Sequence, residues 1–227
     1  MARDDFPPAP VPSIPSVAKT PKGFVPKGWK LEKAVTGDLN GDKITDVAIV
    51  IHSDDPKLIV GKSEGDLGRD TFDSNPRSVI VALGEKGGGY RLIGANHVLI
   101  PRVDDGVIDD PFEMKDITLK NGVLSLSIRL WSSAGSWSTS STAFTFRYRD
   151  GGMWLIGYDN DHIHRGSGDQ TVTSVNFLSG KMSVGEGSIE HDRVKTRWTR
   201  IGKKPLTRFD DVPNGWKFDP APDEADQ

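Results

Sequence analysis

The stretch GDLNGDKITDVAIV, residues 37–50, places oxygen-bearing side chains at a regular spacing directly ahead of an apolar run. Calcium prefers about six to eight oxygen ligands that converge from a short loop. Loop positions 1, 3, 5 and 9 would supply side-chain oxygens and position 7 a backbone carbonyl, which here means Asp38, Asn40, Asp42, Asp46 and the carbonyl of Ile44. Because clustered carboxylates repel one another unless a cation offsets their charge, the spacing predicts a structural calcium site. The alternative is a polar turn that holds no metal.

This loop differs from an EF-hand. An EF-hand carries a bidentate Glu at position 12 and Gly at position 6, whereas this sequence has Ile49 and Lys43 there. Gly41 allows a tight turn, and an apolar run follows at once, so we expect the loop to join two strands. Nothing in the loop implies an open coordination position for a substrate, so the ion would have a structural role.

The segment WSSAGSWSTSS, residues 131–141, is the second candidate site. It joins two well-patterned strands and places Trp131 and Trp137 among Ser and Thr residues and one Gly. Small polar residues around a rigid aromatic anchor suit the recognition of a groove on a partner, because Trp is frequent at the energetic centres of interfaces. The alternative is a plain hairpin end whose Trp side chains fold back on the sheet. GYDNDHIHR, residues 157–165, is a second polar segment of this kind, with Tyr158 as its aromatic anchor.

Two further patterns contain chemically active side chains. His162 and His164 lie two residues apart and would share a face of a strand, as zinc-ligand pairs often do, but no third ligand stands out. We therefore expect an exposed strand end there. The segment VDDGVIDDP, residues 103–111, offers paired carboxylates such as a glycosidase uses, yet it has the composition of a solvated loop.

The composition excludes several classes of protein. The chain has 227 residues and a net charge of −3, which gives no electrostatic basis for binding nucleic acid. It contains no cysteine, so a disulfide framework, a thiolate zinc site and a cysteine nucleophile are excluded. No apolar run is long enough to cross a membrane as a helix. The 25 Gly and 15 Pro residues instead indicate a fold with many turns.

Residues 1–26 are rich in Pro and poor in large apolar residues, which predicts a flexible spacer of polyproline character. The segment does not show the basic and then apolar pattern of a signal peptide. A Met placed directly before such a spacer indicates a chain from which a leader has been removed. Spacers of this kind often tether a lipoprotein to a membrane, so we expect a lipid anchor that this sequence lacks.

Beyond the spacer the chain shows strand patterns and almost no helical periodicity. A first antiparallel group is expected at residues 46–52, 77–84 and 90–100, and a second at 116–131, 144–148, 153–159, 171–177 and 193–201. In the second group apolar and polar residues alternate, and Asn-Gly at 121–122 and Asp-Gly at 150–151 predict hairpin turns. Two such groups predict an all-β domain over 27–205, built as an antiparallel sandwich or as propeller-blade-like stacked sheets, before an irregular tail over 206–227. The acidic loop occurs once, so a full repeat propeller is not expected.

The acidic loop resembles the D-x-N-x-D-x-x-x-D loop of integrin-type FG-GAP propeller blades. Three more motifs, SAGSW at 133–137, FRYRDGGMWLIGYD at 146–159 and TSVNFLSGK at 173–181, accompany the Pro-rich leader. Together these elements resemble bacterial envelope proteins related to the invertebrate-type periplasmic lysozyme inhibitors, over residues 27–205. Within that group the resemblance is greatest to immunity lipoproteins that protect a cell against a lysozyme-like effector delivered by type IV secretion.

The resemblance implies an all-β, calcium-bound protein of the periplasm that is not an enzyme and is held at the outer membrane as a lipoprotein. It would block a lysozyme-like peptidoglycan hydrolase by placing a rigid loop in the glycan cleft. A Ser hydroxyl would bond the catalytic Glu, whose pKa is raised in such clefts, and a Trp ring would occupy a sugar position. The matching positions are Ser133, Gly135, Ser136 and Trp137, with Tyr158 and Asp159 as a flanking contact.

Two other functions use the same residues. A cell-wall carbohydrate-binding protein would stack Trp131 and Trp137 on sugar rings, and it would bind purified cell wall without inhibiting any enzyme. A glycosidase would use the carboxylates of residues 103–111, and it would lyse cell wall alone.

Overall fold

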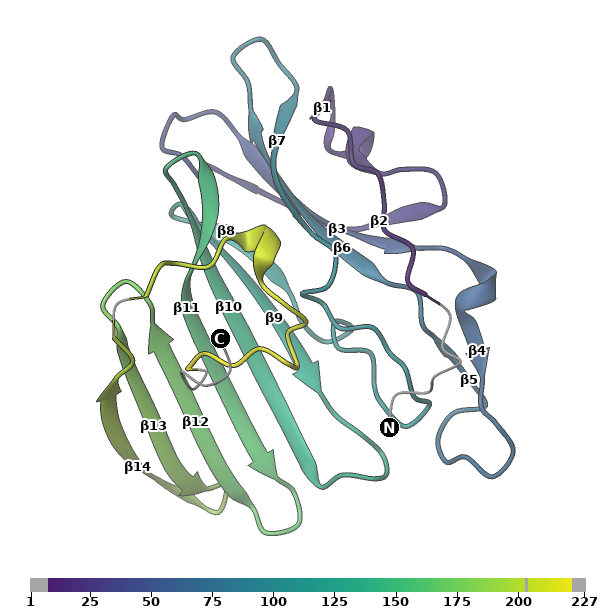
Figure 1. The fold of residues 1–227 in the computed structure, drawn as a ribbon, viewed down its shortest axis with the longest axis vertical. Helices are drawn as coiled ribbons and strands as arrows, with labels where there is room; N and C mark the ends of the chain where they lie inside the picture. The colour runs from purple at the N-terminus through teal and green to yellow at the C-terminus, as the bar shows by residue number, and fades with distance from the viewer. Residues whose placement is uncertain (1–7, 203, 222–227) are drawn as a thin grey trace.

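The computed structural model describes residues 8–202 and 204–221 and shows an all-β protein (Figure 1). Fourteen strands of this part of the chain form two main antiparallel sheets and one two-stranded sheet, and its helical elements are three short 3₁₀ turns. None of its helices is long and apolar enough to cross a membrane. The prediction of an all-β fold of stacked antiparallel sheets is confirmed. Residues 1–7 of the predicted spacer and 222–227 of the predicted tail lie outside the described residues.

The first sheet has the strand order β1-β7-β6-β3-β2, and every neighbouring pair is antiparallel. Its strands are β1 (Val17–Ala18), β2 (Trp29–Gly37), β3 (Asp46–Ser53), β6 (Arg77–Gly84) and β7 (Tyr90–Asn96). Between β3 and β6 lie η2 (Pro56–Leu58) and the small sheet of β4 (Ile59–Gly61) and β5 (Thr71–Asp73). The acidic loop joins β2 to β3, and the paired residues Gly37 and Asp46 form its base.

The second sheet is a meander whose order, β14-β13-β12-β11-β10-β9-β8, follows the sequence. Its strands are β8 (Ile117–Lys120), β9 (Val123–Leu130), β10 (Ser138–Arg149), β11 (Gly152–His164), β12 (Asp169–Asn176), β13 (Lys181–Ser188) and β14 (His191–Arg200). Both predicted hairpin turns occur, since Asn121, Gly122, Asp150 and Gly151 all have positive φ, as tight two-residue turns require. The sequence pattern missed β13, because small residues occupy much of KMSVGEGS.

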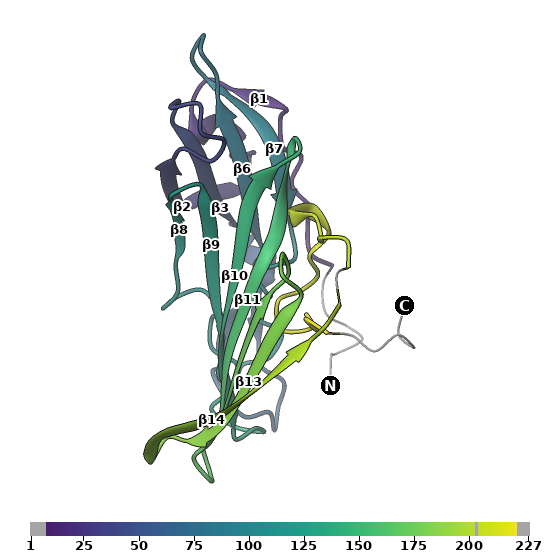
Figure 2. The ribbon, with the colours of Figure 1, turned by 90° about the vertical axis from the view of Figure 1, so that its left-hand side faces the viewer.

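The main core lies between the two large sheets. The first sheet contributes Val50 and Val81, and the second contributes Leu126, Phe144 and Phe146, all of them buried. Figures 1 and 2 show β13 and β14 at the end of the second sheet away from the first sheet. The second sheet therefore buries only part of its inner face and continues beyond the core, which explains why its strands keep the apolar and polar alternation of a half-exposed sheet.

Strands β3 and β6 are buried on both faces. One face joins the main core, and the other forms a second core with Ile49, Ile51 and Ile80 around the fully buried ring of Phe24. Phe24 ends η1 (Pro21–Phe24), so the N-terminal segment covers the outer face of the first sheet. This double burial explains why DVAIVIH and RSVIVALG are apolar without alternation.

The predicted extent of the spacer, residues 1–26, is therefore wrong at its C-terminal end. β1 pairs with β7 through Val17 opposite Arg91 and Ala18 opposite Tyr90, and η1 follows directly. The Pro-rich composition conceals this role, because Pro21 is well suited to open a helical turn and the segment's partners lie far along the chain.

The predicted C-terminal tail has an irregular backbone, but it belongs to the core. Apart from η3 (Phe209–Asp211), it contains no helix or named strand within residues 206–221. Phe209 and Val212 are nevertheless buried, and the ring centre of Phe209 lies 5.1 Å from that of Phe146. In Figure 1 this yellow segment crosses the second sheet. The expected end of the folded domain at residue 205 is thus too early.

Candidate functional site

The loop between β9 and β10 brings the four predicted inhibitory residues together. Ser133, Gly135, Ser136 and Trp137 line one open hollow of about 400 Å³, which they share with Ala134 and Arg165. Arg165 belongs to another part of the chain, directly after β11. The structure thus places the predicted loop residues on one surface and adds a cation beside them.

The two Trp side chains of this segment differ in their surroundings. Trp137 is 65% exposed, so its ring is available to a partner. Trp131 instead lies against two guanidinium groups, with the carbon of Arg165 at 4.9 Å and that of Arg129 at 5.7 Å from its ring centre. Trp131 therefore supports the loop, and only Trp137 offers a free aromatic surface.

Arg165 holds the loop by its backbone carbonyls, a role that the sequence pattern did not reveal. Its Nη2 donates to the carbonyls of Ser132 and Ser136, each at 2.7 Å, and its backbone N–H donates to the carbonyl of Trp137 at 2.8 Å. Hydrogen bonds from a charged donor are stronger than neutral ones. The loop is therefore ordered before any partner arrives, which lowers the entropic cost of binding.

Residues 103–111 hold the same loop by backbone hydrogen bonds. The N–H of Ser133 donates to the carbonyl of Val107 at 2.9 Å, and the N–H of Asp109 donates to the carbonyl of Trp131 at 3.0 Å. The two serines of the hollow then differ. Ser133 Oγ donates to the Val107 carbonyl at 3.3 Å, whereas Ser136 Oγ accepts from the N–H of Ser138 at 3.0 Å. Ser136 thus retains its own proton for a donor role.

Asp110, one of the carboxylates of residues 103–111, belongs to a buried cluster of ion pairs. Asp110 accepts from Arg77 at 2.9 and 2.7 Å, and Arg77 also donates to Glu32 at 2.7 and 2.9 Å. Burial alone would raise the pKa of Asp110, but the charge and hydrogen bonds of Arg77 outweigh it and hold that pKa below its usual value. A carboxyl kept ionised in this way is unsuited to donate a proton.

The prediction that Tyr158 makes an exposed flanking contact is wrong. Tyr158 is buried, and its ring centre lies 5.6 Å from that of Phe144 in the main core. Burial raises the pKa of its hydroxyl. Because β11 continues to His164, Tyr158 lies mid-strand rather than at a strand end. Asp159 is exposed, but it pairs with Ala143, five residues along β10 from Ser138, a separation of about 16 Å along the strand.

The acidic loop is curled by hydrogen bonds from its own backbone to its side chains. Asp38 accepts from the N–H groups of Gly41 at 2.7 Å and Lys43 at 3.0 Å. Asn40 Oδ1 accepts from the N–H of Asp42 at 3.0 Å, and Asp42 Oδ1 accepts from the N–H of Ile44 at 2.7 Å. Such Asx turns direct side-chain oxygens to the inside of a loop. Lys43 has a φ of 67°, so this position adopts the left-handed conformation for which Gly is usual.

Asp46 differs from the other acidic residues because it is completely buried. Its Oδ2 accepts from the N–H of Leu39 at 2.6 Å, and its Oδ1 accepts from the N–H of Gly84 at 2.9 Å. Burial raises the pKa of Asp46 against the effect of these two bonds, and repulsion from Asp42 and Asp38 raises it further. Asp46, at the start of β3, thus ties Leu39 of the acidic loop to Gly84 at the end of β6.

These residues fit calcium by their chemistry. All predicted ligand atoms are oxygens, as calcium prefers, and repulsion from Asp42 and Asp38 adds to the rise in the pKa of Asp46 that burial mainly causes. Among the described residues, however, no group of three or more His, Cys, Asp or Glu side chains is arranged to hold a metal ion. That finding includes His162 and His164, which share one face of β11 as expected. The calcium site stays a prediction.

Comparisons with known proteins found no counterpart: no protein-family model matches the chain, and no curated protein or solved structure is significantly similar to it. The fold and the candidate site therefore define the protein as an all-β protein of two antiparallel sheets with a supported, partly exposed Ser and Trp loop. Any relation to lysozyme inhibitors stays a prediction from the motifs described above.

Proposed function

We propose that this chain is an immunity protein of the bacterial periplasm that binds a lysozyme-like peptidoglycan hydrolase effector and blocks its active site. The loop at residues 131–137 would enter the glycan cleft, and the chain itself would perform no chemistry. The observation that carries the proposal is the shared hollow of Ser133, Gly135, Ser136 and Trp137, in which Trp137 is 65% exposed on a loop held by Arg165.

The chemistry of the hollow suits a cleft that binds sugars and carries a carboxylic acid. The Trp137 ring would occupy a position where a sugar ring normally stacks, and the Ser136 hydroxyl would donate to the catalytic carboxyl group. Rigid aromatic anchors on ordered loops lose little conformational freedom on binding. A lipid anchor preceding this sequence would hold the protein at the outer membrane, where such an effector arrives.

Calcium has a supporting place in this proposal. Asp38, Asn40, Asp42, the carbonyl of Ile44 and Asp46 would hold the ion, which when bound supplies positive charge that offsets the carboxylates of the loop. The loop fixes the β2–β3 hairpin, and Gly122 in the β8–β9 turn lies directly against it, since a Cβ there would be 3.6 Å from the Leu39 carbonyl oxygen. The ion would therefore stabilise the contact between the two sheets.

The test is a lysis assay with purified cell wall and a lysozyme-like hydrolase. The protein should suppress lysis, and Trp137→Ala should weaken the complex by about 30-fold or more, as expected for a hot-spot Trp. Trp198→Ala is the matched control, because Trp198 is 69% exposed on β14 and lies outside the hollow. Cell-wall binding without suppression would replace the proposal by a carbohydrate-binding function, and lysis by the protein alone would replace it by a glycosidase.

A further inference from the structure

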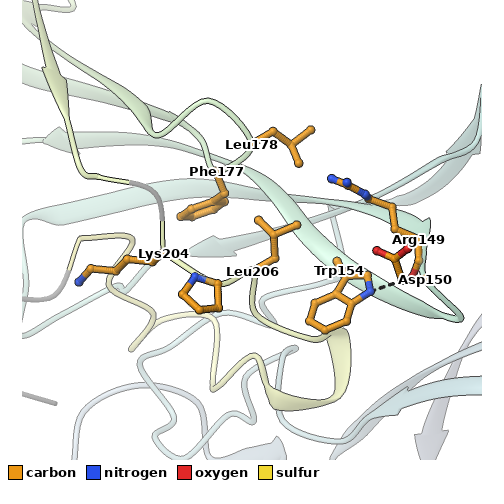
Figure 3. A pocket seen from close by; sticks show the side chains of 8 residues that line it. Arg149, Asp150, Trp154, Phe177, Leu178, Lys204 and Leu206 are labelled. Carbon is orange, nitrogen blue, oxygen red and sulfur yellow. Dashed lines mark hydrogen bonds between the residues drawn. The ribbon is translucent and has the colours of Figure 1, made fainter.

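A second hollow, of about 390 Å³, opens at another end of the second sheet (Figure 3). Its lining comes from three segments: the end of the β10–β11 hairpin, the β12–β13 turn and the chain after β14. The lining residues are Arg149, Asp150, Trp154, Phe177, Leu178, Lys204, Pro205 and Leu206. None of them lines the hollow of the Ser and Trp loop, so the two places are separate.

Backbone hydrogen bonds hold the walls of this hollow in place. The N–H of Leu155 donates to the carbonyl of Thr207 at 2.9 Å, and the N–H of Phe177 donates to the carbonyl of Ile156 at 3.0 Å. The indole N–H of Trp154 donates to the carbonyl of Arg149 at 2.8 Å. The polar atom of the indole is thus satisfied within the protein. The guanidinium carbon of Arg208 lies 5.3 Å from the centre of the ring, and the part of the ring that Arg208 leaves uncovered lines the hollow. The binding surface is therefore formed before a ligand binds.

The lining combines an apolar floor with charges at its rim. Trp154, Phe177 and Leu206 form the floor, and in Figure 3 Lys204 and Arg149 lie at opposite ends of it. Asp150 is the one acidic residue of the lining, against these two cations. A sugar would need many polar partners for its hydroxyl groups, and this hollow has few. The charge balance and the floor instead suit an apolar body with one negative charge.

We propose that this hollow binds a small amphiphilic anion, such as a medium-chain carboxylate. The apolar body would lie on Trp154, Phe177 and Leu206, and the carboxylate would lie near Arg149 or Lys204. The site is independent of the proposed inhibition, since it uses no residue of the loop at 131–137. Its ligand would be a free small molecule, because a hollow of this volume accommodates a compound of drug size or less.

The test is a titration followed by NMR through the indole N–H signals of the Trp residues. Three probes share one apolar body: octanoate, octanol and octylammonium. The Trp154 signal should shift, while those of the exposed Trp137 and Trp198 stay unchanged, and octanoate should bind most tightly and octylammonium least. Arg149→Gln and Lys204→Gln should each weaken octanoate binding about two- to fivefold, the range of a solvent-exposed charge contact.

Two controls make the outcome decisive. Lys86→Gln removes an exposed cation in the turn between β6 and β7 and should leave octanoate binding unchanged. The double variant Arg149→Gln and Lys204→Gln should bind octanoate no better than octanol. Equal binding of the three probes by the wild-type protein, or a Trp154 signal that does not move at the solubility limit of octanol, would overturn the proposal.

Discussion

The guanidinium of Arg165 lies 4.9 Å from the ring centre of Trp131 and at the same time bonds the carbonyl of Ser136 at 2.7 Å. One side chain from the end of β11 therefore fixes both the base and the tip of the loop between β9 and β10. The loop that we propose as the inhibitory element owes its order to a residue 28 or more positions away in the sequence.

Removal of this clamp should loosen the loop. Arg165→Ala deletes charge-assisted bonds to the carbonyls of Ser132, Ser136 and Trp137 together with the contact to the Trp131 ring, so we expect a free energy of unfolding lower by about 1–3 kcal/mol. Amide hydrogen exchange at residues 133–138 should become faster. Arg165→Lys should give an intermediate result, because a single ammonium cannot reproduce the fork of a guanidinium.

Arg129→Ala is the matched control for Arg165→Ala, since Arg129 lies over the same Trp131 ring at 5.7 Å. It should leave exchange in the loop close to that of the wild-type protein. If both substitutions loosen the loop equally, the contact to the ring rather than the bonds to the carbonyls sets its order. The exchange measurement needs no partner enzyme, so it decides this point whether or not the protein inhibits a hydrolase.

A buried charge cluster links β2, β6 and residues 103–111. Arg77 is 7% exposed and meets Glu32 and Asp110. Arg77→Ala would leave two carboxylates without their partner, so we expect a loss of about 3–5 kcal/mol in the free energy of unfolding, measured by urea denaturation. Arg77→Met removes the same charge but keeps most of the side-chain volume. If lost packing contributes to the destabilisation by Arg77→Ala, Arg77→Met should lower the free energy of unfolding by less.

The same cluster predicts a dependence of stability on pH. Arg77 holds the pKa of Asp110 below its usual value despite the opposing effect of burial. The folded state therefore binds this proton less readily than the unfolded state, so the contribution of Asp110 is present above about pH 4 and is lost as the pH falls through the folded pKa. Asp110→Asn should flatten the stability profile in that acidic range. The control is Asp70→Asn. The hydrogen bond from Lys62 also lowers the pKa of Asp70, but solvent screens this exposed pair, so the substitution should change the profile much less.

Residues of the acidic loop can contribute to stability in two ways, by binding calcium and by bonding buried backbone N–H groups. If the loop binds calcium, the ion should raise the melting temperature and a chelator should lower it. Asp42→Ala should remove this response at little cost in chelator, because Asp42 is exposed. Asp46→Ala should also destabilise the protein in chelator, by about 2–4 kcal/mol, since it strips acceptors from the buried N–H groups of Leu39 and Gly84. A wild-type melting curve that is the same in excess calcium and in excess chelator would refute the predicted calcium site.

Local patterns predicted the strands of the second sheet except β13. Alternation in LSLSIR and the Asn-Gly and Asp-Gly turns determine strand spacing and register through neighbouring residues alone, so β8 to β11 follow from the sequence. The four loop residues from Ser133 to Trp137 are likewise close in the chain, and the structure keeps them on one surface.

The failures have one physical cause, which is contact between distant segments. Tyr158 has a polar sequence environment, but the Phe144 ring, set opposite it by the register of β10 and β11, draws it into the core. Phe24 lies in a Pro-rich stretch, and only its packing on β3 and β6 orders it. Arg165 directly follows His162 and His164, whose spacing is typical of zinc ligands, and its own partners are backbone carbonyls, which a sequence pattern does not identify.

Asn96 shows how one such distant contact holds the C-terminal segment, and it offers a final test. Its Nδ2 donates to the carbonyls of Phe209 at 2.7 Å and Val212 at 2.8 Å. Its Oδ1 accepts from the N–H groups of Val98 at 2.9 Å and Leu99 at 2.7 Å. The side chain is 1% exposed, so all four of these bonds are shielded from water.

Asn96→Asp keeps the shape of the side chain but replaces two donors by an oxygen that faces two carbonyls. We expect this change to lower the free energy of unfolding by about 3 kcal/mol or more, because the new carboxylate would place a buried negative charge against two carbonyl oxygens and leave both without a donor. The C-terminal segment should detach and become sensitive to protease between residues 202 and 221. Asn214→Asp is the control, because Asn214 lies in the same segment and its Oδ1 only accepts, from the N–H of Trp216 at 3.0 Å, a role that a carboxylate preserves. Equal protease resistance of Asn96→Asp and the wild-type protein would show that the other contacts of the segment, such as the packing of Phe209 and the bond from the N–H of Ala95 to Asp210, suffice to hold it.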